Sequence, residues 1–341
     1  MSLIYEDEWG YFISHADFIE KIYENVNAKD ISKSFKFQKD LFRIDYPYTK
    51  LKTKNCLKRK HENEEYNSHF RSEVDHVKSL YTVFYNKLAA NKIFKINASR
   101  ENRLRNDDAL IASQNIYHVS GLHTVKDVIG ENTNDAIEVE IQKTHYIFPE
   151  DSKFYCSDIN PPWWNKYIRR KKAKVNNSGT YAMMYNDDLK ELPIEHLISE
   201  TAVVIVWCTN STSHLSYLTD VIFEKWKVKY MKKWYWMKVT TAGEPICNFS
   251  EPPGKQPFEQ IIFASTCGEK FDNIPDKKLV VSVPSALHSH KPPLAELLQK
   301  FLPGNLKKLE IFARYLLPHW TSYGLEALRF QHCSLYEGKI Q

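Results

Sequence analysis

The chain has 341 residues, of which 43% are apolar, and it carries a formal net charge of +5 at pH 7. This length allows about two or three domains with buried cores, and the mild positive charge does not by itself indicate nucleic-acid binding. The six cysteines include no Cys-x-x-Cys pair, and no apolar run approaches the roughly 20 residues of a membrane helix, so we expect neither a metal site nor a membrane span.

The cysteines and the N-terminal residues also bear on the cellular compartment. The scattered cysteines are typical of free thiols in a reducing environment. The acidic sequence MSLIYEDEWG at the N-terminus has no apolar core of the signal-peptide type. We therefore expect a protein of the nucleus or the cytosol.

Residues 1–115 are predicted to form a mainly helical N-terminal accessory region that could bind nucleic acid. Ser14 is a suitable N-cap for an amphipathic helix, and a second helical pattern covers residues 74–90. The mixed-charge residues 50–65 between them are typical of a solvated loop. The basic run of residues 58–60 within this loop is a weak match to a nuclear-import signal.

Residues 116–341 are predicted to form a second domain of the α/β class. Residues 202–207 are apolar throughout, which is typical of a parallel strand covered on both faces. Further strands are expected at residues 153–158, 260–264, 279–283 and 309–313, with β-forming residues at 226–239 and helices at 189–198, 213–224 and 292–301. This alternation predicts a largely parallel sheet, closed by its last strand, with a ligand site at the carboxyl ends of the strands.

The segment with the clearest chemical signature is Asn160-Pro161-Pro162-Trp163, directly after the first of these strands. Two prolines stiffen a turn and offer no N–H donors, so the neighbouring carbonyl groups are held in place. The Asn160 amide oxygen and a backbone carbonyl could accept both protons of an adenine amino group, while the Trp163 indole stacks on the base. Such contacts would orient the nitrogen lone pair toward a methyl donor. The alternative is a plain Pro-Pro turn beside a packed Trp, because short motifs give false positives.

Several further sequence blocks accompany this motif in a fixed order, and together they resemble the MT-A70 family of adenine-N6 methyltransferases. The blocks are Asn165-Lys166 and residues 207–210, 234–238, 283–293, 309–314 and 320–322. The resemblance implies a Rossmann-like class I methyltransferase sheet with helices on both faces and S-adenosylmethionine as the cofactor. It also implies N6-methyladenine, or its 2′-O-methylated counterpart, as the product, in RNA such as U2 small nuclear RNA or in DNA.

The resemblance also suggests roles for individual residues. The motif residues Asn160, Pro161, Pro162 and Trp163 would be catalytic. The resemblance assigns contacts with the cofactor to Ser157, Asp158, Ile159, Arg314 and Glu326. For Arg314, a surface ion pair is the alternative.

Candidates for contacts with the nucleic acid follow the motif directly. They are Trp164, Asn165, Lys166, Arg169 and Arg170. The basic run that begins at Lys166 could bind phosphates close to an extruded base. A solvated loop is the alternative for this run.

Two features depart from the family pattern. The family motif is Asp-Pro-Pro-Trp, and Asn160 replaces the Asp, which removes a negative charge but keeps an oxygen acceptor. The family also has two strands before the end of the motif. Here residues 157–159 match the end of the earlier strand and run straight into Asn160, so we expect a central strand to be lost. A nucleic-acid-binding protein with impaired catalysis is therefore the alternative function.

Overall fold

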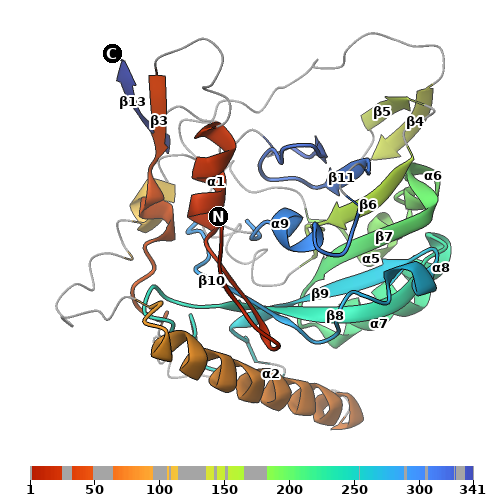
Figure 1. Ribbon diagram of the computed structural model, residues 1–341. Helices are drawn as coiled ribbons and strands as arrows, with labels where there is room; N and C mark the ends of the chain where they lie inside the picture. Colours follow the sequence, from red (N-terminus) through yellow and green to blue (C-terminus); the bar gives the residue numbers. More distant parts are fainter. Residues whose placement is uncertain are drawn as a thin grey trace.

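A computed structural model describes residues 2–24, 33–48, 64–94, 106, 109–113, 136–141, 144–149, 153–164, 183–252, 254–287, 290–303, 306–325, 327 and 335–340. Its centre is a nine-stranded mixed sheet with the strand order β1-β2-β10-β8-β9-β7-β6-β11-β12 (Figure 1). Two small antiparallel pairs lie outside it, β3 (Lys33–Phe37) with β13 (Tyr336–Ile340) and β4 (Ala136–Ile141) with β5 (Thr144–Pro149).

The strands of the large sheet include all those expected from the sequence. In sheet order they are β1 (Leu3–Glu6), β2 (Gly10–Ile13), β10 (Leu279–Ser282), β8 (Lys229–Lys238), β9 (Phe258–Ser265), β7 (Ile198–Cys208), β6 (Phe154–Ile159), β11 (Lys308–Ile311) and β12 (Thr321–Tyr323). Neighbouring strands from β7 to β12 pair in parallel, and so do β8, β10 and β2. Strand β9 is antiparallel to both of its neighbours, and β1 is antiparallel to β2. The sheet is thus mixed, and β12 rather than β11 forms its edge.

The helices pack on both faces of this sheet, as predicted for the α/β class. Side chains alternate along β7, so Val204 and Val206 face α5 (Asn186–Lys190), α6 (Ile194–Leu197), α7 (Thr212–Tyr217) and α8 (Phe223–Lys225). Trp207 faces the opposite side, where α9 (Ala295–Leu298) packs. The figure shows α2 and α7 below the strands and α9 above them (Figure 1).

Two of the predicted helices are shorter than expected, and proline explains both. The helix expected at residues 189–198 is divided into α5 and α6, and Ile198 already belongs to β7. Pro193 lies between them, and its ring prevents an uninterrupted helix. Of the helix expected at residues 292–301, only α9 is present. A residue that precedes a proline rarely adopts helical backbone angles, so Pro292, which precedes Pro293, does not begin the helix. The helix expected at residues 213–224 is present as α7, the π-helical turn η3 (Leu218–Ile222) and α8.

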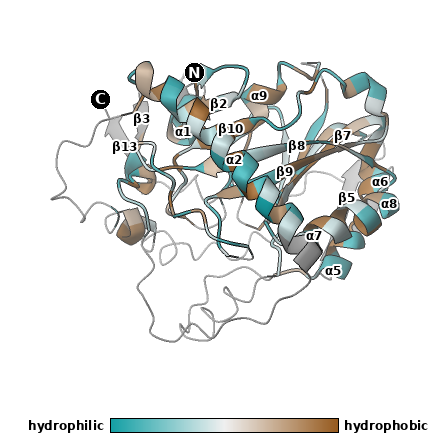
Figure 2. Ribbon diagram, turned by 90° about the horizontal axis from the view of Figure 1, so that it is seen from below, coloured by the Kyte–Doolittle hydropathy of each residue, from teal (hydrophilic) through white to brown (hydrophobic). Residues whose placement is uncertain are grey.

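The N-terminal region contains the two predicted helices and also contributes strands to the large sheet. Helix α1 (His15–Glu24) begins after Ser14, whose hydroxyl accepts a hydrogen bond from the Asp17 N–H at 3.1 Å. Strand β2 pairs in parallel with β10. The apolar face of α2 (Glu64–Ala90) packs on β8 and β10, while its outward face is largely hydrophilic (Figure 2). Strand β2 and helix α2 of this region therefore share one sheet and core with the rest of the described chain.

The sheet is continuous at β6, where the sequence predicted the loss of a central strand. Strand β6 pairs in parallel with β7 on one side and with β11 on the other. Ser157-Asp158-Ile159 and the approach to Asn160 thus belong to one strand, which lies between β7 and β11 in the sheet. One strand therefore leads directly into the motif, as the sequence indicated, and it pairs with both of its neighbours, so the sheet has no gap.

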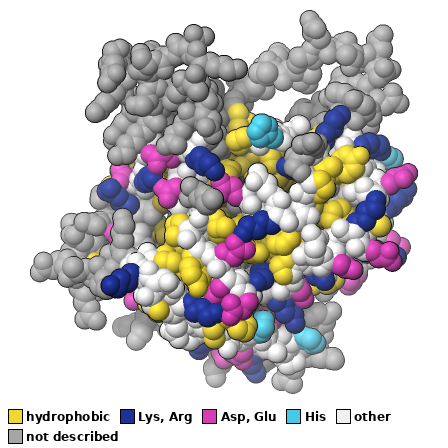
Figure 3. Space-filling view, viewed as in Figure 1, with side chains coloured by type: hydrophobic (Ala, Val, Ile, Leu, Met, Phe, Trp, Pro, Cys, Tyr) yellow, Lys and Arg dark blue, Asp and Glu magenta, His cyan; other side chains and the backbone are white. Residues whose placement is uncertain are grey.

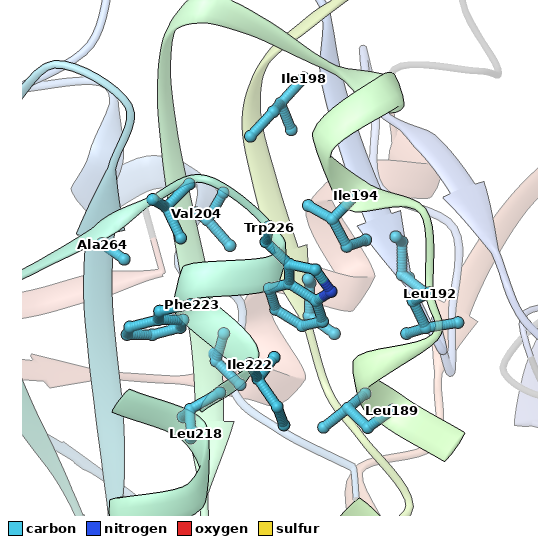
Figure 4. Packing of buried hydrophobic residues seen from close by; sticks show 14 of the residues in the cluster. Leu189, Leu192, Ile194, Ile198, Val204, Leu218, Ile222, Phe223, Trp226 and Ala264 are labelled. Atoms are coloured by element: carbon cyan, nitrogen blue, oxygen red, sulfur yellow. The ribbon is translucent and has the colours of Figure 1, made fainter. Parts of the chain in front are cut away.

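Trp226 lies at the centre of the core between the sheet and helices α5 to α8. Its ring is completely buried and is surrounded by Leu189, Ile194, Ile222 and Phe223 (Figure 4). These contacts bring together side chains from four helical segments. The packing of this face of the sheet therefore depends on one large ring.

We expect Trp226→Ala to lower the free energy of unfolding by about 3–5 kcal/mol, because it removes a large buried ring and leaves a cavity. Urea denaturation measures the change. Tyr230→Ala is a matched control, since Tyr230 is 47% exposed and its loss is expected to change stability by less than about 0.5 kcal/mol. Equal stabilities of the two variants would contradict this account of the core.

Candidate active site

The Asn160-Pro161-Pro162 corner lies at the carboxyl end of β6. The Asn160 N–H donates to the Ile311 carbonyl at 3.1 Å, which ties the corner to the end of β11. The Trp163 N–H donates to the Pro161 carbonyl at 2.9 Å, so the turn closes on itself. The Pro162 carbonyl accepts the Met184 N–H at 2.9 Å. These bonds hold the corner rigidly at the edge where parallel sheets bind ligands.

Trp163 is a core residue rather than an exposed stacking surface. It is only 6% exposed, and its indole N–H donates to the Trp207 carbonyl at 2.7 Å. Its ring stacks on His214, with centroids 4.9 Å apart and planes 20° apart. The prediction that this indole stacks on a substrate base is therefore wrong for this structure. The packed Trp that the sequence left as an alternative describes Trp163, which fixes the corner to the end of β7.

Two buried carboxyl groups face each other beside the corner. Asp158 and Glu310 are direct cross-strand partners in β6 and β11, and they are 6% and 7% exposed. Burial raises the pKa of Asp158 to about 7, although a hydrogen bond from Trp207 and the charge of Lys291 act in the opposite direction. Burial and the neighbouring Asp158 raise the pKa of Glu310 well above its ordinary value. Asp158 Oδ1 and Glu310 Oε2 have no hydrogen-bond partner among the described residues.

Two cationic side chains complete this edge of the sheet. Arg314 is buried just after β11, and its charge opposes the rise in the pKa of Glu310. Lys291 is paired with Glu259, and its ammonium group lies 5.6 Å from the Trp207 ring centroid and 5.3 Å from that of Trp236. Burial lowers the pKa of Lys291 to about 8.

Glu259 holds Lys291 in place from the neighbouring antiparallel strand. It lies at the start of β9 and pairs with both Lys238 and Lys291. Burial would raise the pKa of Glu259, but the two lysines hold it far below its ordinary value. The carboxyl ends of these strands thus bring together two kinds of group. The two facing carboxyl groups can bind hydroxyl groups or a positive charge, and the fixed ammonium group of Lys291 can bind a carboxylate.

The other predicted site residues have different positions. Ser157 lies in β6, and its buried hydroxyl has no partner among the described residues. Ile159 is completely buried in the core cluster, so its side chain is directed away from any ligand at this edge. Trp164 follows the corner and stacks on Tyr185. Several predicted site residues lie outside the described residues, namely Asn165, Lys166, Arg169, Arg170 and Glu326.

Three further residues of this site, Glu310, Lys291 and Glu259, were not expected there from the sequence. Glu310 had a visible signal, since it is an acidic residue flanked by the apolar Leu309 and Ile311 in a strand. Lys291 lies within a block that carried the family resemblance, but its spacing from the motif gave no hint of proximity. Glu259 had no signal in the sequence, because its position depends on the antiparallel insertion of β9.

Within the described part of the chain, no group of three or more His, Cys, Asp or Glu side chains could hold a metal ion. None of the helices described is both long and apolar enough to cross a lipid bilayer.

Known proteins are similar in sequence to this chain over more than half of its length. The human N(6)-adenine-specific methyltransferase METTL4 is 31% identical over 237 residues, which cover 61% of this chain and 48% of that protein. The N6-methyladenosine RNA methyltransferase MTA1 of Pyricularia oryzae is 33% identical over 57% of this chain and 52% of its own. The DNA N6-methyl methyltransferase of Caenorhabditis elegans is 31% identical over 55% of this chain and 54% of its own.

These matches confirm the predicted resemblance and limit how far it extends. The chain spans about half the length of the curated relatives it matches. The MT-A70 family model matches residues 154–326, from the first residue of β6 to just beyond β12. Since this match includes the motif corner, the buried carboxyl pair and half of the chain, the chain belongs to the MT-A70 family.

Proposed function

We propose that the chain transfers a methyl group from S-adenosylmethionine to N6 of an adenine in nucleic acid. The observation that carries this proposal is the position of the Asn160-Pro161-Pro162 corner beside the Asp158–Glu310 pair, at the carboxyl ends of β6 and β11. The matched relatives are named as methyltransferases of adenine N6, in RNA for one and in DNA for another. The geometry of the site and the names of the similar proteins thus support the same class of reaction, methyl transfer to adenine N6.

The residues at this edge fit the proposed cofactor. When bound, S-adenosylmethionine supplies an electrophilic methyl group on a sulfonium centre. The buried oxygens of Asp158 and Glu310 that have no partner among the described residues could accept hydrogen bonds from its ribose or ammonium group. Lys291 could pair with its carboxylate, and Arg314 lies close enough to Glu310 to influence its charge. Buried groups that lack partners are costly, and such a ligand would remove that cost.

The corner fits the amino group of an extruded adenine. The Asn160 amide oxygen can accept one amino proton. The Pro161 carbonyl already accepts the Trp163 N–H, but a carbonyl oxygen has a second lone pair for the other amino proton. Because both acceptors are fixed by the turn, orientation of the attacking nitrogen is the main catalytic contribution of the chain.

We also propose that the substrate is RNA, such as U2 small nuclear RNA, or DNA, and that the chain acts in the nucleus. Charges of both signs are mixed on the visible face of the described residues, which argues against binding by a broad basic surface alone (Figure 3). Recognition would then depend on local contacts close to the corner. Methylation assays with matched single-stranded RNA and DNA oligonucleotides compare the two substrates.

A nucleic-acid-binding protein without methyl transfer is the second candidate function. It is favoured by Asn160, which stands in place of the motif Asp and removes a negative charge from the corner. Isothermal titration calorimetry with S-adenosylmethionine separates the two candidates. Clear binding supports the methyltransferase, and its absence supports the second function.

We expect Asn160→Ala to lower kcat for methyl transfer by at least about a hundredfold, because it removes a fixed acceptor for the amino group. Asn160→Asp, which restores the family motif, should retain or increase kcat. Transfer of a labelled methyl group to an adenine-containing oligonucleotide measures both. Trp163→Ala is a poor control, since Trp163 belongs to the core. Equal rates for wild type and Asn160→Ala would refute the proposed role of the corner.

We expect the affinity for S-adenosylmethionine to be highest between about pH 7 and pH 8. Below this range Asp158, with a pKa of about 7, becomes protonated and loses its attraction for a cationic ligand. Above it Lys291, with a pKa of about 8, loses its proton and its attraction for a carboxylate. Calorimetry across pH 6–9 tests the profile. Asp158→Asn should abolish the loss of affinity at acidic pH, and Lys291→Met should abolish the loss at alkaline pH. A wild-type affinity that does not change with pH would argue against both contacts.

A further inference from the structure

Next to the corner, two aromatic side chains form a partly exposed stack. The rings of Trp164 and Tyr185 have centroids 6.0 Å apart and planes 21° apart. Trp164 is half-buried, whereas Tyr185 is 59% exposed. Large aromatic rings are normally buried, so an exposed ring that extends a stack beside a reaction centre suggests a binding surface.

The backbone holds this pair in a fixed position relative to the corner. The Trp164 N–H donates to the Met184 carbonyl at 3.0 Å, and Met184 in turn donates to the Pro162 carbonyl. The Tyr185 N–H donates to Asp188 Oδ2 at 2.9 Å, and the Tyr185 carbonyl accepts the Leu189 N–H at 3.1 Å. Tyr185 is therefore anchored at the start of α5. A rigid aromatic surface loses little entropy when it binds a ligand.

We propose that Tyr185, supported by Trp164, forms a stacking platform for the base next to the target adenine in a single-stranded nucleic acid. The proposal rests on the proposed function, because it assumes that the adenine enters the corner. A base stacked here would lie beside the turn that receives its neighbour. Trp163 cannot take this role, since it is buried and covered by His214.

The chemistry of the neighbourhood favours a nucleic acid over another protein as the occupant. Every base has a flat π face, so stacking on Tyr185 needs no particular sequence. In the sequence, a basic run begins at Lys166, two residues after Trp164, and its charge complements phosphates. The platform would thus bind and align a nucleic-acid strand whose target base is turned out from its neighbouring bases.

The experiment measures the affinity of the whole chain for a short fluorescein-labelled single-stranded RNA with one adenine, by fluorescence anisotropy. We expect Tyr185→Ala to weaken binding by about five- to hundredfold, the usual effect of losing one base–aromatic stack. Tyr185→Phe, which keeps the ring, should bind within about twofold of wild type. Tyr230→Ala is the matched control and should bind like wild type. Tyr230 is also exposed, but it lies near the start of β8, away from the carboxyl ends of β6 and β11.

A second oligonucleotide links the effect to the flanking base. Replacing the base beside the adenine with an abasic site should weaken binding to wild type but not weaken binding to Tyr185→Ala any further, since both changes remove the same stack. Three results would overturn the proposed platform. They are a Tyr185→Ala variant that binds the RNA as tightly as wild type, losses from the variant and the abasic site that multiply, and a wild-type chain that does not bind the RNA. The proposed enzymatic function is tested separately, by the assays of methyl transfer and of cofactor binding. A chain with Tyr185-dependent binding but no transfer would contradict only the enzymatic function.

Discussion

One hydrogen bond connects the candidate active site to the core, from the Trp163 indole N–H to the Trp207 carbonyl at the end of β7. The Trp163 ring is packed in the core and stacked on His214, so it moves only if the sheet moves. The prolines before it carry no N–H, and the carbonyls around them are positioned by this anchor and by the bond from Asn160 to β11. A reaction that depends on orientation needs such a rigid corner.

The same edge of the sheet is unfavourable in the absence of a ligand. Asp158 and Glu310 face each other in a buried environment. Loss of hydration raises the pKa of both groups, and the neighbouring Asp158 raises that of Glu310 further. Lys291 and Arg314 offset only part of this cost. Functional sites commonly retain such unfavourable groups, because their interactions are completed by the ligand. In this chain Asn160 stands in place of the motif Asp, so the carboxyl groups beside the corner are those of Asp158 and Glu310.

The sequence predicted most of the sheet and the place of the motif, because apolar strands, helix caps and the Pro-Pro turn are local signals. Ser14 capped α1 and residues 202–207 formed the centre of β7, as expected. The pairing of β6 with both neighbours and the antiparallel course of β9 depend on contacts distant in sequence, so neither could be predicted. For the same reason, Asp158 was identified but its partner Glu310 was not, and the burial of Trp163 was visible only once His214 was placed beside it.

We propose that the corner at the end of β6 presents an adenine amino group to the methyl donor. The most direct measurement is transfer from S-adenosylmethionine with a labelled methyl group to a single-stranded oligonucleotide with one adenine, compared with an oligonucleotide in which inosine replaces it. Inosine keeps the purine ring but lacks the amino group. The account predicts label on the first oligonucleotide alone, recovered as N6-methyladenine. Equal labelling of both, or labelling of neither by a chain that binds the cofactor, would contradict it.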